Sequence, residues 1–303
     1  MENNLLTVSI GISAYNEEGN IARLIEEVRT QRTPHFMIKE IIVVSDGSTD
    51  ETADIVRGVP DVRVRLIERD VRVGQAQCQN EILGIFESDA LIFLEADTRL
   101  ETVDYLALLT YPIWSCTADL VFGLSVAQSG GGFIERSLTL ADRVKKRICM
   151  ENVESDFFLC HSGKALSRSF AKRMRFMPDA PEDALTFLKA KELGFRTMFE
   201  GDAVTYYRSA GTVFDYFHKY ARFAASHKQL QKYVSADVIA RHKYFPHRKY
   251  FIALVRAGWE SPTLVGAYSA MHIGARFHAF LWGSANPLWR VSLSTKNLGR
   301  AYE

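Results

Sequence analysis

The chain is poor in the features that mark secreted, zinc-binding or membrane-spanning proteins. Its four cysteines are far apart and form neither a Cys-x-x-Cys pair nor the Cys/His spacing of a zinc site, which favours a reducing compartment. The N-terminal Met-Glu-Asn-Asn lacks the basic and apolar regions of a secretory signal. The absence of any uninterrupted apolar run of about 18 residues argues against a transmembrane helix. We therefore expect a cytoplasmic protein.

The chain also lacks an excess of charge of either sign. Lysine and arginine number 37 and aspartate and glutamate 36 in 303 residues, so no overall field would attract nucleic acid. The hydrophobic share of 47% can bury a full core, and no repeat or low-complexity tract is present. The bases are unevenly distributed, since eight of them and one acid, Asp237, lie between His218 and Tyr250. This segment can face phosphates or anionic lipid.

The first half of the chain alternates apolar segments with amphipathic ones, as βαβ units do. The predicted strands are 7–14, 40–45, 62–67, 90–94 and 120–126, and the predicted helices are 18–30, a segment after Ser48, and 74–88. Ser48-Thr49-Asp50-Glu51 has the pattern of a capping box, which predicts a helix start. We expect an α/β fold with a twisted, mostly parallel sheet flanked by helices.

The second half is mixed and ends in helices. A glycine-rich break at 128–132 precedes a predicted helix at 134–147, another helix runs from Pro181 to Gly194, and short strands are predicted at 196–199 and 204–207. From Phe214 onward the pattern predicts helices rich in aromatic and basic residues. We expect a catalytic domain at 1–213 and a helical C-terminal region at 214–303.

The segment 261–283 is apolar but interrupted by His272, Arg276 and His278. Basic and aromatic residues beside an apolar face are typical of a helix that lies in a membrane interface rather than one that spans the bilayer. A helical appendage packed on the core, or in a homo-oligomer, explains the pattern equally well. Both interpretations stay open.

An apolar segment at 91–94 runs directly into two carboxylates, Glu95 and Asp97. Residues at i and i+2 share a face of a strand, so both acids converge at the carboxyl end of the predicted strand, where open α/β sheets bind ligands. Two hard oxygen ligands at that edge suit Mg²⁺ or Mn²⁺ bridging a diphosphate. A solvated turn after the strand is the alternative.

Four motifs in order resemble the inverting family 2 glycosyltransferases of the GT-A fold, over roughly residues 5–225. They are Ile12-Ser13-Ala14-Tyr15-Asn16-Glu17-Glu18, Val44-Ser45-Asp46-Gly47-Ser48-Thr49-Asp50, Glu95-Ala96-Asp97 and Pro181-Glu182-Asp183-Ala184. The resemblance implies a Rossmann-like, nucleotide-binding GT-A sheet with a C-terminal helical appendage. It also implies metal-dependent inverting transfer of a sugar from a nucleotide diphosphate sugar, with a UDP-sugar favoured, to a hydroxyl acceptor.

The resemblance assigns donor-binding residues. In the family the loop after the first strand lies against the nucleotide, which places Ala14, Tyr15 and Glu17 beside the base and ribose. Asp46 resembles the base-contacting aspartate, although a turn residue in Asp-Gly-Ser is the simpler interpretation. Gln75 stands where relatives often carry lysine, so it offers a neutral amide in place of a cation.

The resemblance also assigns the metal site and the base. Asp97 matches the metal ligand of the family's Asp-x-Asp motif, and Glu95 replaces its first acid, where it can bind the metal, a ribose hydroxyl or a metal-bound water. Asp183 matches the catalytic base that takes a proton from the acceptor hydroxyl. Glu182 orients the acceptor or the base. Both of these acids would also complement a helix dipole without any catalytic role.

Further matches concern the acceptor and the diphosphate. Lys219-Tyr220-Ala221-Arg222-Phe223 stands where processive members carry Gln-x-x-Arg-Trp, so Arg222 can clamp the diphosphate and Phe223 can stack on a sugar. The missing Gln and Trp argue against processive synthesis, and a solvated basic helix face is the alternative. His161, Ser162 and Gly163 resemble the loop that closes over donor sugar or acceptor.

We thus expect an enzyme of cell-envelope or extracellular polysaccharide or glycolipid synthesis. Its acceptor would be a glycan or a lipid-linked intermediate, reached at the cytoplasmic face of the membrane through peripheral contact of the C-terminal region. One alternative is a non-catalytic nucleotide-sugar-binding subunit. The other is a sugar-phosphate nucleotidyltransferase, although the acids of Tyr15-Asn16-Glu17-Glu18 would repel a triphosphate.

Overall fold

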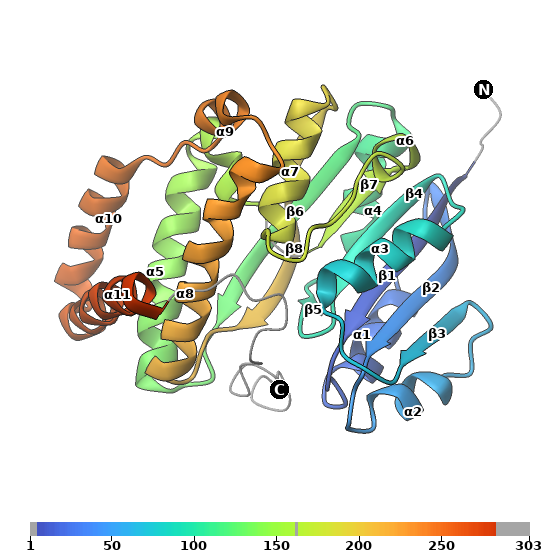
Figure 1. The fold of residues 1–303 in the computed structure, drawn as a ribbon, viewed down its shortest axis with the longest axis horizontal. Coiled ribbons are helices and arrows are strands. Elements are labelled where there is room, and N and C mark those ends of the chain that lie inside the picture. The colour runs from blue at the N-terminus through green and yellow to red at the C-terminus, as the bar shows by residue number, and fades with distance from the viewer. Residues whose placement is uncertain (1–4, 161–162, 283–303) are drawn as a thin grey trace.

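The computed structural model describes residues 5–160 and 163–282 and contains one mixed sheet (Figure 1). The strand order is β3-β2-β1-β4-β7-β6-β8-β5. The strands are β1 (Leu6–Ala14), β2 (Phe36–Asp46), β3 (Val64–Arg69), β4 (Ala90–Glu95), β5 (Arg99–Leu100), β6 (Leu120–Gln128), β7 (Lys164–Ser167) and β8 (Thr197–Arg208). The first four strands pair in parallel, and β7 runs antiparallel to both β4 and β6. The predicted α/β fold with a mostly parallel sheet is confirmed.

Helices cover both faces of the sheet. One apolar core includes side chains of α1 (Ile21–Arg29), α2 (Thr52–Arg57) and α4 (Tyr105–Trp114). The opposite core includes side chains of α3 (Gln75–Ile85), α6 (Arg168–Ala171) and α7 (Glu182–Glu192). The central strands are therefore buried on both faces, which is why they appear in the sequence as continuous apolar runs.

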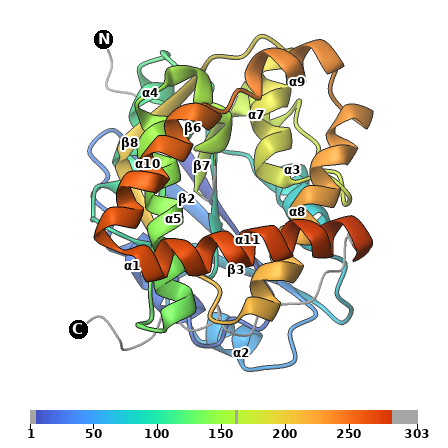
Figure 2. The ribbon, with the colours of Figure 1, turned by 90° about the vertical axis from the view of Figure 1, so that its left-hand side faces the viewer.

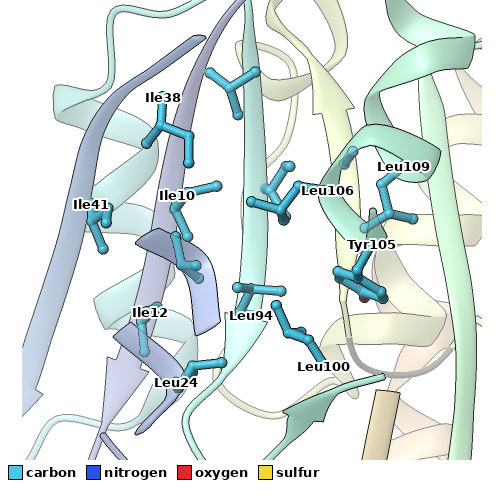
Figure 3. Packing of buried hydrophobic residues seen from close by; sticks show 14 of the residues in the cluster. Ile10, Ile12, Leu24, Ile38, Ile41, Leu94, Leu100, Tyr105, Leu106 and Leu109 are labelled. Carbon is cyan, nitrogen blue, oxygen red and sulfur yellow. The ribbon is translucent and has the colours of Figure 1, made fainter. Parts of the chain in front are cut away.

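Strand β4 illustrates how the core positions the site. Ile92 and Leu94 point into the first core, part of which, including Leu94 and Tyr105, is shown in Figure 3, while Leu91 and Phe93 point into the second. Side chains alternate along a strand, so Glu95 continues the side of Leu91 and Phe93. The strand thus delivers its terminal carboxylate to the edge of the sheet, on the side that α3 and α7 cover.

A helix from the middle of the chain and the C-terminal helices form a further helical layer. It consists of α5 (Phe133–Met150), α8 (Val213–Gln229), α9 (Ala236–His242), α10 (His247–Glu260) and α11 (Pro262–Trp282), with short 3₁₀ turns at Val153–Phe158 and Leu230–Lys232. Helix α5 contacts β6, and helix α9 contacts α7. In Figure 2, α11 crosses α5 and α8, and α10 runs along α5. Within the described residues, no helix combines the length and the apolar character that crossing a bilayer requires.

Several sequence-based predictions need correction. Helix α1 begins at Ile21 rather than at residue 18, because the Glu17 carbonyl accepts hydrogen bonds from Asn20 and Ile21 in a preceding turn. The capping box at Ser48 is wrong: Glu51 is the N-cap, and the Ser48 hydroxyl accepts a hydrogen bond from the Asn16 backbone. The segments 196–199 and 204–207 form a single strand, β8, with a register shift beside Gly123.

Candidate active site

A cleft of about 1480 Å³ opens between the carboxyl edge of the sheet and the helical layer. It brings together most of the predicted site residues: Ala14, Tyr15, Glu17, Asp46, Gln75, Glu95, Asp97, Glu182, Asp183, Arg222 and Phe223 line it. Gly163 is not among the lining residues. A Cβ at that position would overlap the Tyr105 hydroxyl, so the glycine allows a close approach of two elements. His161 and Ser162 lie outside the described residues.

The loop after β1 is fixed to the loop after β2. Asn16 accepts a hydrogen bond from the Thr49 backbone at 2.8 Å, and the Glu17 backbone N–H donates to the Thr52 hydroxyl at 2.7 Å. The Glu17 carboxylate is 5% exposed and accepts a bond from the Asn20 amide at 2.8 Å. The loop therefore presents Tyr15 and Glu17 to the cleft in a defined conformation.

Asp46 binds the next loop along the sheet edge. Its two carboxylate oxygens accept hydrogen bonds from the backbone N–H groups of Val73 and Gly74, each at 2.8 Å. Gly47 has φ +66° and no room for a Cβ, which would lie 2.6 Å from the Arg72 nitrogen. Because Asp46 reaches across to another loop, it is not the local turn residue that its Asp-Gly-Ser context suggests. It anchors the segment that leads into α3 at Gln75.

The same segment carries a cation that the sequence analysis did not single out. The guanidinium carbon of Arg72 lies 4.1 Å from the centroid of the Tyr15 ring, and both residues line the cleft. This is a cation–π distance. Gln75 is neutral, so Arg72 supplies positive charge three positions earlier in this loop. Its contact with Tyr15 is made across two loops, which is why no local pattern reveals it.

Glu95 and Asp97 both lie half-buried in the cleft, although Glu95 ends β4 and Asp97 lies in the turn after it rather than on the same strand face. The Thr98 hydroxyl donates to the Glu95 carbonyl at 2.8 Å and closes the turn that carries Asp97. Burial, followed by the negative charges of Asp183 and Asp97, raises the pKa of Glu95 to about 8. Glu95 of β4, Asp97 of the next turn and Asp183 of α7 therefore repel one another in a partly buried part of the cleft.

This donor set fits a divalent cation. Hard carboxylate oxygens suit Mg²⁺ or Mn²⁺, and a nearby cation would relieve the repulsion among the acids. In residues 5–160 and 163–282, no three His, Cys, Asp or Glu side chains are grouped as a complete metal cage. Two carboxylates match a cation that completes its coordination with phosphate oxygens and water.

Asp183 pairs with a lysine. The ammonium group of Lys164 donates to an Asp183 carboxylate oxygen, and the two side chains are 3% and 23% exposed. Burial opposes the charged form of Lys164, yet its pKa is raised, because Asp183 stabilises the ammonium ion. Both Asp183 and Glu182 belong to the first turn of α7, so their charges also complement the helix dipole. The pairing holds the Asp183 carboxylate at the cleft in one orientation.

Sequence analysis missed Lys164 for a topological reason. Parallel strands bring their last residues to the carboxyl edge of a sheet, but β7 is antiparallel and brings its first residue there. Lys164 accordingly lies opposite Phe93 of β4 and Phe122 of β6. The sequence shows only a lysine at the start of a short segment, Lys-Ala-Leu-Ser. That lysine can be assigned to the site only when β7 is known to be antiparallel to its neighbours.

Helix α8 contributes two cations to the opposite wall. Lys219 and Arg222 are three residues apart, so they share a helix face. Burial lowers the pKa of Lys219, and the positive charge of Arg222 lowers it further, while Asp97 and Glu95 oppose the shift. Burial also lowers the pKa of Arg222, against the opposing charges of Glu182, Glu95 and Asp97. The Arg222 guanidinium also lies 5.2 Å from the Phe223 ring centroid. Both residues are half-buried and line the cleft together with the acids, so this part of α8 is not simply a solvated helix face.

The inner end of the cleft combines bases with aromatic rings. Lys146 of α5 pairs with Asp142 at 2.9 Å, and its ammonium nitrogen lies 4.8 Å from the Tyr207 ring centroid. Lys219 approaches the same ring at 5.4 Å. Burial, and then Asp142, raises the pKa of Tyr207 well above its usual value. The periodicity of α5 predicted its helix but gave no indication that it lines the site.

A mostly parallel nucleotide-binding sheet, with acids at the end of β4 and at the start of α7, has the architecture of GT-A glycosyltransferases. The family model described as Glycosyl transferase family 2 matches residues 9–174, which is more than half of the chain. The chain belongs to this family.

Two curated relatives match shorter stretches. The teichoic acid poly(glycerol phosphate) polymerase of Staphylococcus epidermidis is 32% identical over 96 residues, 31% of this chain and 13% of that protein. The Escherichia coli UDP-Glc:alpha-D-GlcNAc-diphosphoundecaprenol beta-1,3-glucosyltransferase WfaP is 34% identical over 90 residues, 30% of this chain and 35% of that protein. In both cases the similarity spans only a minor part of the relative's length.

Solved structures agree on the fold. The mannosyltransferase PcManGT from Pyrobaculum calidifontis, in complex with GDP-Man and Mn²⁺, has a TM-score of 0.61 at 19% identity and covers 92% of this chain and 85% of its own. S. aureus TarS in complex with UDP has a TM-score of 0.52 at 19% identity, with coverages of 80% and 68%. At such identities the likeness establishes a GT-A fold.

Proposed function

We propose that the protein is a metal-dependent inverting glycosyltransferase that moves a sugar from a nucleotide diphosphate sugar, preferably a UDP-sugar, to a hydroxyl acceptor. One observation carries this proposal: a single cleft joins the acids Glu95 and Asp97, the acid Asp183 and the cation Arg222. These side chains come from β4, the turn after it, α7 and α8. Family membership and relatives named as UDP-sugar or cell-envelope enzymes support it.

The donor nucleoside would lie against the loops after β1 and β2, between Tyr15, Glu17 and Asp46, with Ala14 at the strand end. Its diphosphate would meet Asp97 and Glu95 through Mn²⁺ or Mg²⁺. When bound, this ion would act as a Lewis acid and neutralise charge on the departing nucleoside diphosphate. Mn²⁺ is present in the complex of the similar mannosyltransferase, which supports a divalent cation here.

Cationic side chains of the protein would also bind the diphosphate and neutralise part of its charge. Arg222 has a planar fork of donors that suits phosphate oxygens, and Lys219 adds a second positive charge from the same helix face. Gln75 and Arg72 would contribute from the opposite loop. Phe223 offers an apolar ring to a sugar face.

Asp183 would act as the base in transfer. Its carboxylate takes the proton from the acceptor hydroxyl while that oxygen attacks the anomeric carbon and the bond to the diphosphate breaks. A single displacement of this kind inverts the anomeric configuration. Lys164 would be a positioning residue, since it touches Asp183 rather than the substrate. Glu182, beside Asp183, would orient the acceptor, and we assign the same role to His161, Ser162 and Gly163 on the basis of family resemblance.

The acceptor we propose is a glycan or lipid-linked intermediate of cell-envelope, extracellular polysaccharide or glycolipid synthesis, reached at the cytoplasmic face of the membrane. The division into a catalytic domain at 1–213 and a helical region at 214–303 belongs to this proposal. Helix α8 would then complete the site from the helical region, through Lys219 and Arg222.

The test is a donor screen with Mn²⁺ that measures nucleoside diphosphate release from UDP- and GDP-sugars, with and without lipid-linked and glycan acceptors. We expect release with one donor, and loss of release in Asp183→Asn while UDP binding persists. Tight UDP binding without release under every condition would instead indicate a non-catalytic binding subunit. Pyrophosphate release from a nucleoside triphosphate and a sugar phosphate would indicate nucleotidyl transfer.

A further inference from the structure

Helices α10 and α11 form the outermost layer of the molecule. They are joined at Ser261 and lie nearest the viewer in Figure 2, where α10 descends and α11 runs across the molecule. Their inner sides pack on α5 and α8. In α11 the buried residues are Met271 and Ala275, four positions apart on one helix face. The remaining circumference of both helices faces outward.

The outward face of α10 is apolar. Four large side chains recur along it at i, i+1, i+4 and i+8, and they are 42 to 86% exposed: Phe251, Ile252, Val255 and Trp259. A surface helix of a globular protein normally turns such a stripe toward the core. Here the stripe that packs inward is a different one, which contains Leu254 and Ala257.

Helix α11 repeats the arrangement. Ile273, Phe277, Phe280 and Leu281 follow one another at i, i+4, i+7 and i+8, and they are 48 to 85% exposed. The helix contains no acidic residue. Exposed apolar side chains scattered singly are normal, but these two adjoining helices expose the eight large apolar side chains named above, and gathered apolar side chains mark interaction sites.

Positive charge accompanies the apolar stripes. Arg248, Lys249 and Arg256 are exposed on α10, and Glu260 is the single acid of that helix. Arg276 of α11 is exposed as well, but it lines the cleft and is not counted with these bases. Long basic side chains can place their charge beside the polar heads while their methylene groups cover apolar surface. The surface therefore matches a partner that is apolar within and negatively charged at its border.

We propose that the outward face of α10 and α11 binds the surface of an anionic lipid bilayer. Trp259, Phe277 and Phe280 would enter the boundary between head groups and acyl chains, and the bases would meet lipid phosphates. A second copy of the chain fits less well, because two copies of this face would bring their arginines against one another.

The opposite side of α11 reaches the cleft. Tyr268, His272 and Arg276 belong to this helix and line the cleft. One helix therefore separates the proposed lipid surface from the cleft. This step rests on the proposed function: an acceptor anchored in the bilayer would enter the cleft beside α11 and need not leave the membrane.

The test is flotation of the full chain with phosphatidylcholine vesicles, with or without phosphatidylglycerol. We expect co-flotation only with the anionic lipid, and weaker binding at high salt. Trp259→Ala with Phe280→Ala, and Arg248→Glu with Arg256→Glu, should each weaken partitioning about tenfold or more. Because all four positions are exposed, the variants should keep the melting temperature of the wild type.

Matched controls are available on other surfaces. Val62 and Val71 are exposed apolar residues in loops of the N-terminal half, and Lys172 and Arg173 are exposed bases after α6. Val62→Ala with Val71→Ala, and Lys172→Glu with Arg173→Glu, should leave flotation unchanged. An effect of these controls equal to that of the α10 and α11 variants would contradict a specific face.

Three results would overturn the proposal: no flotation, equal binding to neutral vesicles, or binding that survives both double substitutions. A concentration-dependent dimer that light scattering detects without lipid, and that Trp259→Ala with Phe280→Ala abolishes, would assign the face to a second copy. UDP binding and release are measured without vesicles, so failure of lipid binding is distinguishable from failure of the transferase proposal.

Discussion

The two walls of the cleft differ in their prevailing charge and in how they are built, although Arg72 lies on the sheet side and Asp142 and Asp215 on the helices. The sheet edge presents acids, among them Glu17, Asp46 and Asp97, while α5 and α8 present Lys146, Lys219 and Arg222. The Lys164–Asp183 pair lies where β7 and α7 bring a base and an acid together. The acids suit a cation and nucleoside hydroxyls, and the bases suit phosphate. The contrast indicates that the sheet and the helical layer bind different parts of one charged substrate.

The largest effect is expected at the acid between the two walls. Asp183→Asn keeps the shape of the side chain but removes its ability to accept a proton, so the turnover number should fall about 10²- to 10⁴-fold. UDP affinity, measured by calorimetry, should change by less than about twofold, because the substitution leaves the nucleotide contacts intact. Near-wild-type turnover in Asp183→Asn would remove Asp183 from the mechanism.

The next largest effect is expected at the base wall, the positively charged wall that Lys146, Lys219 and Arg222 form. Arg222→Gln removes a charged donor, and because hydrogen bonds to charged groups contribute about 1.5–3 kcal/mol, UDP affinity should fall about 10- to 100-fold. Arg222→Lys should restore part of it, since it keeps the charge and loses the fork. Lys228→Gln, an exposed position on the same helix, is the control and should bind UDP normally. An equal loss in both variants would mean that the effect is nonspecific.

A smaller effect is expected for the residue that positions the base. Lys164→Met removes the positive charge that stabilises the Asp183 carboxylate, so turnover should fall about tenfold and the acid limb of the pH–rate profile should move to higher pH. Lys164→Arg should shift the profile less. A buried partner is lost, so the melting temperature must be followed alongside. A uniform drop in turnover with an unmoved pH profile would indicate a purely structural role.

The smallest effect concerns the helical layer alone. Burial, then Arg276 and Lys145, lowers the pKa of His272, which bonds to the Tyr216 hydroxyl at 3.1 Å and also contacts Tyr220 and Tyr268. The folded state therefore disfavours the imidazolium, and stability should decrease as the pH falls through 6.5, where the unfolded chain takes up the proton.

Urea unfolding at about pH 7.5 and pH 5.5 measures this decrease. His272→Gln should lessen it by less than about 1 kcal/mol, and His247→Gln, at an exposed position, should leave it unchanged. A larger acid-induced loss in His272→Gln than in the wild type would reverse the inferred sign.

The walls also differ in how well the sequence predicts them. Part of the acid wall follows from a local pattern, the apolar strand followed by Glu95 and Asp97, whereas Tyr15 and Glu17 in the loop after β1 are assigned through the family resemblance. Parallel strands must bring such residues to one edge. Asp183 is assigned through the family resemblance of Pro181-Glu182-Asp183-Ala184, since acids at a helix start alone predict no more than a favourable interaction with the helix dipole. Only the first of these assignments follows from the direction of the strands alone.

The base wall and the linking residues depend on tertiary contacts. Lys164 reaches the site because β7 runs in the reverse direction. Arg72 is brought to the site by a contact between two loops, and Lys146 by the packing of α5 against the sheet. The sequence analysis did not predict helix α4. This helix is buried on most sides, so its sequence has no polar face and shows no helical alternation of polar and apolar residues. In each case the deciding information is the position of another element, which a local pattern does not contain.

The central claim is that the acid wall binds a nucleoside diphosphate through a divalent cation. Calorimetry of UDP binding with and without Mn²⁺, for the wild type and Asp97→Ala, tests it most directly. The account predicts tight binding that requires Mn²⁺ and is abolished in Asp97→Ala. Binding that is independent of the metal, or unchanged in Asp97→Ala, would contradict it.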